Sequence, residues 1–139
     1  MSVVSKKIKL ATKGDTDIID VTSQVASAVS KSGVKNGIAT VFVSGSTGGL
    51  TTVEYEPGLV QDLKTYFEKI APKSGKYEHN ARWHDGNGYA HVRASFLGPS
   101  LSVPFNNAEL QLGTWQQIIF IDFDNRPRSR ELLVQILGD

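Results

Sequence analysis

The sequence predicts an α+β fold: a single compact domain, residues 1–139, in which a largely antiparallel β-sheet sandwich carries two main helices. Runs rich in β-branched and aromatic residues dominate the chain. The helical patterns lie mostly in the first half and do not alternate regularly with strands, which favours α+β over a parallel α/β fold. No internal repeat, low-complexity segment or linker divides the 139 residues, a length typical of one domain.

The chain is predicted to begin with two strands and a helix. A Lys13-Gly14-Asp15 turn joins strands at residues 3–11 and 17–21. Thr22 is expected to cap a helix that runs to Ser32, where Gly33 stops it.

The middle of the chain is predicted to hold two strands and a longer helix. The strands cover residues 37–44 and 50–55, on either side of the glycine-rich segment 45–49. Pro57 then begins a helix to about Ile70, whose apolar side chains recur at helical spacing.

The rest of the chain changes from loop to strands. Residues 72–88 are polar and glycine-rich, which predicts mostly loop, and residues 90–97 fit either a short helix or a strand. The remaining strands are predicted at residues 100–105, 109–112, 116–123 and 131–137, with a turn at Asn106-Asn107.

The composition excludes several classes of function. The 15 Lys and Arg nearly balance the 14 Asp and Glu without long blocks of one sign, which argues against nucleic-acid binding and against a polybasic membrane anchor. Cysteine is absent, so disulfides, thiolate metal sites and a cysteine nucleophile are excluded. No stretch resembles a signal peptide or a membrane span, and we therefore expect a cytoplasmic protein.

All three histidines of the chain, His79, His84 and His91, lie in one glycine-rich segment. Imidazole is the usual acid–base group at neutral pH and a common ligand of transition metals. The spacing matches no standard metal motif, and HExxH is absent. The cluster is a candidate for acid–base chemistry at His79 and His91, or for a divalent metal such as Zn²⁺ held by all three.

Two turns offer polar groups to a ligand. The segment Asp85-Gly86-Asn87-Gly88 is typical of a tight turn, although Asp85 and Asn87 also present a carboxylate and an amide. Gly45, Ser46 and Thr47 can cradle a phosphate with backbone amides and hydroxyls, or form a plain loop.

Glu54 and Glu56, just past the glycine-rich segment 45–49, are candidates for a base or an Mg²⁺ ligand. Solvated charges at the end of a strand are the alternative, above all for Glu56. The chain lacks the ending of a P-loop, the nucleophile elbow of serine hydrolases and the GxGxxG of dinucleotide-binding folds.

A further block combines aromatic, amide and basic residues. Gly113-Thr114-Trp115-Gln116 opens an apolar run at 118–123, and residues of this kind at the entrance to a strand either wall a pocket or plug a core. In the turn that follows, Arg126, Arg128 and Arg130 would point to one side if the backbone is extended. Such a trio is either a solvated rim or a site for phosphate or carboxylate.

Three blocks carry a resemblance to a known family. They are Leu50-Thr51 through Glu54; Tyr77-x-His79 followed by a polar loop and Ala90-His91-Val92-Arg93-Ala94-Ser95, ending at Gly98; and Leu112-Gly113-Thr114-Trp115-Gln116 with Arg126-Pro127-Arg128-x-Arg130. From Gly37 onward the chain thereby resembles the YjbQ-like proteins, also labelled secondary thiamine-phosphate synthase enzymes.

The resemblance implies a homotrimer and a site lined by His79, His91 and the 113–116 segment, near a subunit interface. It also implies an activity that joins a pyrimidine pyrophosphate to a thiazole phosphate and releases pyrophosphate. One departure stands out: many relatives have His-Thr-Thr/Ser-Ala where this chain has Gly45-Ser46-Thr47-Gly48. The first histidine of that motif is therefore missing here. If it supplies a ligand or a proton in the family, His84 is the candidate to supply an imidazole in its place.

Two hypotheses of different class follow. A transferase would hold its phosphorylated substrate electrostatically, bridge it through Mg²⁺ on Glu54 or Asp85, and stack Trp115 on a heteroaromatic ring. The groups expected to clamp phosphate are Arg93, Arg126, Arg128 and the 45–49 amides. The alternative is a non-catalytic trimeric module that captures a small anionic metabolite with the same residues. A metal-dependent hydrolase, resting on the histidines, is a third option.

Overall fold

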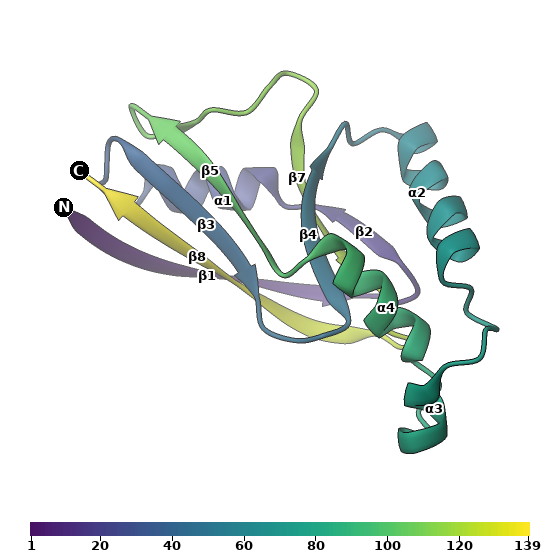
Figure 1. Ribbon diagram of the computed structural model, residues 1–139. Coiled ribbons are helices and arrows are strands. Elements are labelled where there is room, and N and C mark those ends of the chain that lie inside the picture. The colour runs from purple at the N-terminus through teal and green to yellow at the C-terminus, as the bar shows by residue number, and fades with distance from the viewer.

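Two antiparallel sheets and four helices form the protein in the computed structural model, which describes residues 1–139 (Figure 1). The strands are β1 (Ser2–Thr12), β2 (Asp17–Asp20), β3 (Gly37–Val43), β4 (Gly48–Val53), β5 (Ser100–Asn106), β6 (Glu109–Leu110), β7 (Gln117–Asp122) and β8 (Arg128–Gly138). The helices are α1 (Thr22–Ser30), α2 (Pro57–Ile70), α3 (Glu78–Trp83) and α4 (Gly88–Leu97).

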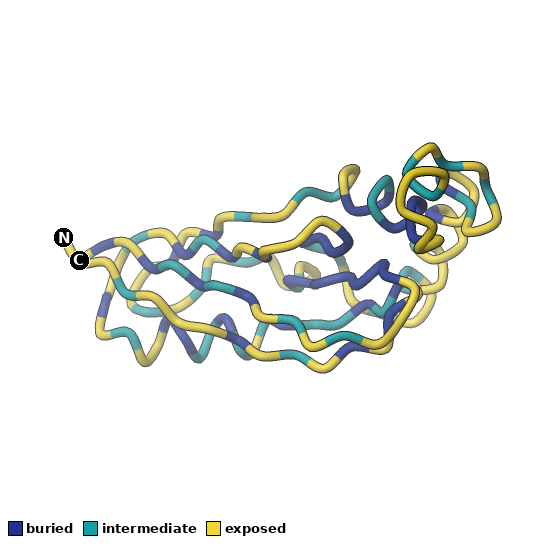
Figure 2. Tube along the Cα trace, turned by 90° about the horizontal axis from the view of Figure 1, so that it is seen from below, coloured by how far each residue is buried: buried dark blue, intermediate teal, exposed yellow.

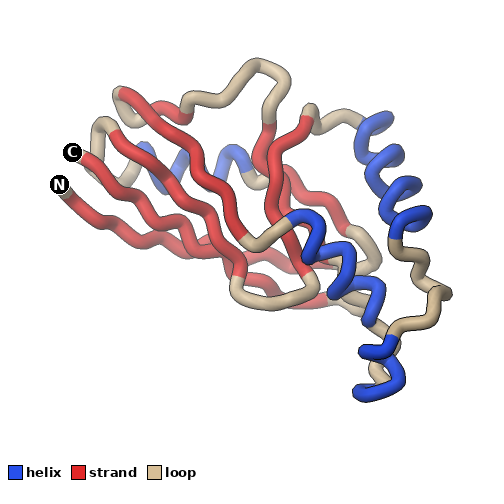
Figure 3. The backbone as a smooth tube through the Cα atoms, in the orientation of Figure 1, coloured by secondary structure: helices blue, strands red, loops and turns tan.

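The sheets differ in size but share the antiparallel arrangement. The larger sheet has the strand order β1-β8-β3-β5-β6 and the smaller one β2-β7-β4, and every pair is antiparallel. The predicted α+β fold with a largely antiparallel sheet is thus confirmed. Figure 3 shows the helices gathered mainly at one side of the strands, as the segregated order of the sequence predicts.

Strand β7 lies between two hydrophobic cores, which explains its unbroken apolar run. Ile118 and Phe120 belong to the core that β7 shares with the five-stranded sheet and α1. Ile119 and Ile121 point the other way and, with Phe123 just beyond the strand, join the core shared with α2 and α4. Because side chains alternate across a strand, both faces of β7 must be apolar.

The helices cover these cores from two sides. Helix α1 buries Val25 and Val29 in the larger core, and α2 packs Phe67 edge-on against Phe123 at 4.8 Å between ring centroids. Helix α2 begins where the Glu56 carboxylate accepts hydrogen bonds from the backbone of Gly58 and Leu59. No helix is long and apolar enough to cross a membrane.

The structure refines or corrects several local expectations. The segment 72–88 is mostly loop but contains the short helix α3, and residues 90–97, which fit either a helix or a strand, belong to helix α4. Thr22 does not cap α1: it is the first helical residue, and its hydroxyl instead donates to Asp20 and accepts from the backbone of Ile118. Arg128 and Arg130 lie in strand β8, which begins earlier than the predicted strand at 131–137.

Both chain ends meet at the opposite end of the molecule from α3, as Figure 2 shows for the termini and Figure 1 for the helix. The amino group of Met1 lies 2.5 Å from the Asp139 carboxylate. Helix α3, the start of α4 and the β3–β4 loop therefore form one end of the molecule, away from the termini.

Candidate functional site

A polar pocket of about 350 Å³ opens at the end of the molecule that carries α3. Its lining comes from four parts of the chain: the β3–β4 loop, helix α3, the turn into α4 and the start of β8. The lining residues are Gly45, Ser46, Thr47, His79, Trp83, Asp85, Asn87, His91, Arg128 and Arg130.

Two of the three histidines meet in this pocket. The imidazole rings of His79, on α3, and His91, on α4, lie 4.2 Å apart between centroids and are tilted by 37°. His79 Nδ1 is buried without a hydrogen-bond partner and lies 3.5 Å from Asp85 Oδ1, close enough for an ion pair when the ring is protonated. His84 ends α3 with its backbone in the left-handed region and its side chain exposed, outside the pocket.

The turn between α3 and α4 brings the histidines together. Asn80 Oδ1 accepts a hydrogen bond from the backbone of Gly88, and Asn125 Nδ2 donates to the carbonyl of Asp85. Gly86 has φ +69, a conformation that glycine adopts freely. A Cβ at Gly88 would lie 2.5 Å from the Cβ of Tyr77, so only glycine fits there.

Arg128 and Arg130, which line the pocket with the histidines, belong to a network with two buried aspartates. Arg130 donates two hydrogen bonds of 2.8 Å to the fully buried carboxylate of Asp122 and one of 2.7 Å to Thr47 Oγ1. Arg128 pairs with the equally buried Asp124 at 2.5 Å. The guanidinium groups are therefore held in fixed positions, with most of their charge compensated by these carboxylates.

The ionisable groups of the site have shifted pKa values. Burial, together with the charge of His79, lowers the pKa of His91 and so favours its neutral form. Burial alone would raise the pKa of Asp124, but the hydrogen bonds from Arg128, Asn125 and Asn87 and the charge of Arg128 together outweigh it, and the pKa falls to about 2. Burial also raises the pKa of Asp122, but the hydrogen bonds from Arg130, Thr12 and the Asp124 backbone and the charge of Arg130 together lower it. Both aspartates are thus ionised at neutral pH.

The β3–β4 loop lines the same pocket and has backbone donors that the protein leaves without an acceptor. The backbone N–H groups of Gly45, Ser46 and Thr47 donate to no oxygen of the protein. Gly45 has φ +135, and a Cβ there would lie 3.4 Å from Arg130 Nη1. Backbone donors beside guanidinium and imidazole groups form a surface suited to an oxyanion.

Other residues that the sequence singled out lie at the far end of the molecule. Gly113, Thr114, Trp115 and Gln116 precede β7, whereas the pocket lies beyond the other end of this strand, roughly 20 Å away at the usual rise per residue. Figure 1 shows the loop before β7 and helix α3 at opposite ends. The Trp115 side chain is 73% exposed.

Glu54 lies at that far end too, because it follows β4, whose last residue, Val53, pairs with Gln117. Gln116 there donates 3.1 Å to Thr52 Oγ1, and Thr52 and Gln116 both line a separate crevice. Arg126 is exposed beyond the pocket lining.

Arg93 has a role in packing away from the pocket. It is buried between α2 and α4, where it donates to the Ala71 carbonyl, Thr16 Oγ1 and Glu68 Oε2 at 2.9, 2.9 and 2.6 Å. These partners satisfy its charge within the fold.

The donors in the pocket do not fit a three-ligand metal site. No group of three histidine, aspartate or glutamate side chains lies close enough together to hold a metal ion. His84 does not line the pocket, and Asp122 and Asp124 are already paired with arginines.

Three residues of the pocket and its support were not singled out from the sequence: Trp83, Asp122 and Asp124. The signal available for the aspartates is their alternation in the segment 122–124, which sends both carboxylates to the side where Arg128 and Arg130 lie. Trp83 carries no comparable signal, because its side chain is 61% exposed and lies at the last turn of α3.

Comparisons with known proteins show the family to which the chain is similar. The profile of the family described as UPF0047 protein YjbQ-like matches residues 6–139. A UPF0047 protein of Methanothermobacter thermautotrophicus is 38% identical over 138 residues, 99% of this chain and 94% of that protein. A YbjQ-like protein of unknown function from Sulfolobus solfataricus has a similar structure, with a TM-score of 0.94 at 36% identity and 99% of both chains covered.

A second solved structure gives the same result. It is an uncharacterized conserved protein of the YjbQ/UPF0047 family from Clostridium acetobutylicum. The TM-score is 0.87 at 38% identity, with 95% of this chain and 99% of that chain covered.

Proposed function

Because the chain belongs to the YjbQ-like UPF0047 family, we propose that its histidine pocket binds the phosphate or pyrophosphate group of a small metabolite and transfers a proton to it. One observation carries this proposal: His79 and His91 stack at 4.2 Å in a pocket that also contains Arg128 and three unpaired backbone amides. Imidazole is the group whose charge changes most readily near neutral pH.

The charges in the pocket couple binding to protonation. Arg128 and Arg130 are compensated by Asp124 and Asp122, so neutral histidines leave little net positive charge for a polyanion. Two protonated rings at this separation would repel each other unless an anion lies against them. A phosphorylated ligand therefore binds best when it takes up protons with it, and bound histidinium can return a proton to a leaving group.

The reaction that we propose is the transferase reaction implied by the resemblance. The ring nitrogen of the thiazole phosphate attacks the methylene carbon of the pyrimidine pyrophosphate, so that a C–N bond forms and the C–O bond to pyrophosphate breaks. Negative charge develops on the departing pyrophosphate, where the arginines and the 45–47 amides stabilise it. Histidinium at His79 or His91 gives this leaving group its proton.

A direct assay tests the transferase. The purified protein is incubated with the two phosphorylated substrates, and released pyrophosphate and thiamine phosphate are quantified. We expect turnover by the wild type, its loss in His79→Ala and in His91→Ala, and retention in the matched control His84→Ala, which lies outside the pocket. No product from the wild type, or equal loss in all three variants, contradicts the proposal.

One observation favours the alternative of a binding module without turnover. Trp115 is the expected partner of a heteroaromatic ring, but it lies before β7, and the pocket lies beyond the other end of this strand. Within one copy, the 113–116 segment therefore provides no aromatic ring for stacking in this pocket. In that case inorganic pyrophosphate binds the wild type in calorimetry and is not bound by His91→Ala, while the transferase assay gives no product.

We further propose that the protein is a homotrimer, the assembly implied by the resemblance. The outer face of the five-stranded sheet exposes Val3, Ile38, Phe42 and Leu137. Leu137 pairs with both Val3 and Ile38, which makes these side chains neighbours on one face, and apolar patches of this kind are typical of assembly surfaces. Light scattering should give three times the 15.1 kDa chain mass, and Ile38→Glu should reduce the measured mass. A monomer mass for the wild type contradicts the trimer.

A further inference from the structure

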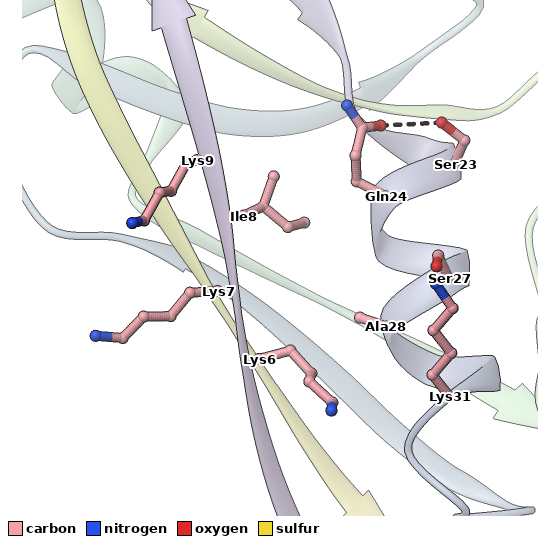
Figure 4. Close-up of a pocket in the computed structure, with 9 residues that line it drawn as sticks. All are labelled: Lys6, Lys7, Ile8, Lys9, Ser23, Gln24, Ser27, Ala28 and Lys31. Atoms are coloured by element: carbon pink, nitrogen blue, oxygen red, sulfur yellow. Dashed lines mark hydrogen bonds between the residues drawn. The ribbon is translucent and has the colours of Figure 1, made fainter.

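A second hollow, with a different character, lies between strand β1 and helix α1. It encloses about 470 Å³, and Figure 4 shows side chains from both elements around it. The lining residues are Lys6, Lys7, Ile8, Lys9, Ser23, Gln24, Ser27, Ala28 and Lys31. Four of them are lysines, and none is acidic.

Most of this positive charge is unpaired. Lys7 lies 3.4 Å from Glu131, but Lys6, Lys9 and Lys31 form no ion pair. Ile8 and Ala28 add apolar surface to the lining, next to the polar side chains of α1. A positively charged surface with some apolar area is complementary to a segment that carries both acidic and apolar side chains.

Strand β1 is also an open edge of the sheet. Its eleven residues pair with β8 on one side, and no strand pairs with the other side. An edge of this length presents a row of backbone donors and acceptors to another extended chain.

We propose that this edge of β1 binds an extended acidic segment of a partner protein, which adds to the sheet as a further antiparallel or parallel strand. The arrangement of the lysines favours a strand over a small anion. Lys6 lies on the face of β1 that carries Ile8, whereas Lys7 and Lys9 lie on the other face, as Figure 4 shows. An added strand projects side chains to both faces and can reach all three, whereas one small anion cannot.

The same lysines argue against a second copy of this chain as the occupant. Lysines on an edge strand discourage pairing between identical edges, because like charges would be brought together. The acidic side chains of a partner segment attract the same lysines, so this edge favours an acidic partner over a second copy of itself.

The test uses a fluorescein-labelled eight-residue peptide with glutamates on both faces of its extended form, titrated into the full chain at low salt. We expect saturable binding, protection of β1 amides from hydrogen exchange, and affinity about tenfold weaker for Lys6→Glu/Lys31→Glu. The matched control Lys64→Glu/Lys76→Glu, which reverses two exposed lysines elsewhere and has the same net charge, should bind as the wild type does.

Two modified peptides complete the test. Replacing glutamate with glutamine should weaken binding, and methylating alternate backbone nitrogens on the pairing edge should abolish it, because those N–H groups form the new ladder. Equal binding of the methylated peptide, equal loss in both charge-reversed proteins, no binding of the acidic peptide, or displacement by inorganic phosphate at equal concentration would each overturn the proposal.

Discussion

The imidazole rings of His79 and His91 lie 4.2 Å apart although they belong to different helices. A six-residue helix and a glycine-containing turn create this contact, and neither ring belongs to a hydrophobic core. Residues in such a position contribute little to packing. Their proximity raises the repulsion between the two rings when both are protonated.

Oxyanion affinity should rise as the pH falls. Burial and the neighbouring ring lower the pKa of His91, so this ring is neutral at neutral pH and must take up a proton to attract an anion. Sulfate is a suitable probe because its own charge is constant over the range. We expect its affinity to increase at least about tenfold from about pH 8 to about pH 6 in calorimetry, and the increase to vanish in His91→Gln. Affinity that is independent of pH would contradict this coupling.

The Asp122–Arg130 pair should be required for stability as a unit. Asp122→Ala leaves a guanidinium that is only 10% exposed without its carboxylate, and we expect a loss of about 3–5 kcal/mol in the free energy of unfolding. Asp122→Ala/Arg130→Met removes both charges and should recover much of that loss in urea titrations. Glu131→Gln is the control, because its exposed pair with Lys7 contributes less than about 1 kcal/mol. Additive losses in the double variant would argue against a coupled pair.

Low pH should remove the contribution of Asp124 to the stability of the folded protein. Its pKa is lowered to about 2 in the folded protein from the ordinary 3.8, so the folded state binds fewer protons than the unfolded state between these values. The stabilisation is complete above pH 3.8 and is lost as the pH falls towards 2. Asp124→Asn should therefore be less stable than the wild type at neutral pH, and the difference should narrow below about pH 4. If the difference in unfolding free energy between the two proteins stays constant down to pH 2, the ionised Asp124 carboxylate is not the source of the stabilisation.

The fluorescence change on ligand binding should come from Trp83. Trp83 lines the histidine pocket, whereas Trp115 is 73% exposed and lies at the opposite end of strand β7 from this pocket. Pyrophosphate should shift the emission of Trp115→Phe as it does that of the wild type, and Trp83→Phe should lose the shift. Trp115→Phe should also change the free energy of unfolding by less than about 0.5 kcal/mol. A shift that disappears only in Trp115→Phe would mean that a neighbouring copy brings this residue to the pocket.

Much of the fold follows from the sequence because most strands carry a strong local signal. The run at 118–123 is apolar at every position but one, and it forms the strand buried on both faces. Helix α3 has no such signal: none of its residues is buried, so its sequence shows no apolar stripe. Helix α4 buries mainly small or polar residues, such as Ala90, Arg93 and Ala94, which explains why 90–97 fitted helix and strand alike.

The site was less accessible from the sequence because its parts meet only in three dimensions. Neighbouring motifs indicated one site for the 113–116 segment and the arginines, but strand β7 separates them by its own length. Arginine is a common phosphate ligand, which made Arg93 a candidate. In the structure its guanidinium group instead donates to Glu68 of α2 and to the carbonyl of Ala71, which follows that helix. The contact between His79 and His91 depends on the left-handed turn after α3, which pattern alone does not fix.

Nuclear magnetic resonance of the histidine side chains tests the central claim most directly, since the chain has only three histidines and one of them, His84, lies outside the pocket. The Cε1–H resonances are titrated with pH in the absence and presence of inorganic pyrophosphate. The proposal predicts that pyrophosphate raises the pKa of His91, shifts the resonances of His79 and His91, and leaves those of His84 unchanged. Unchanged resonances for both pocket histidines at saturating pyrophosphate, or equal shifts at all three, would contradict it.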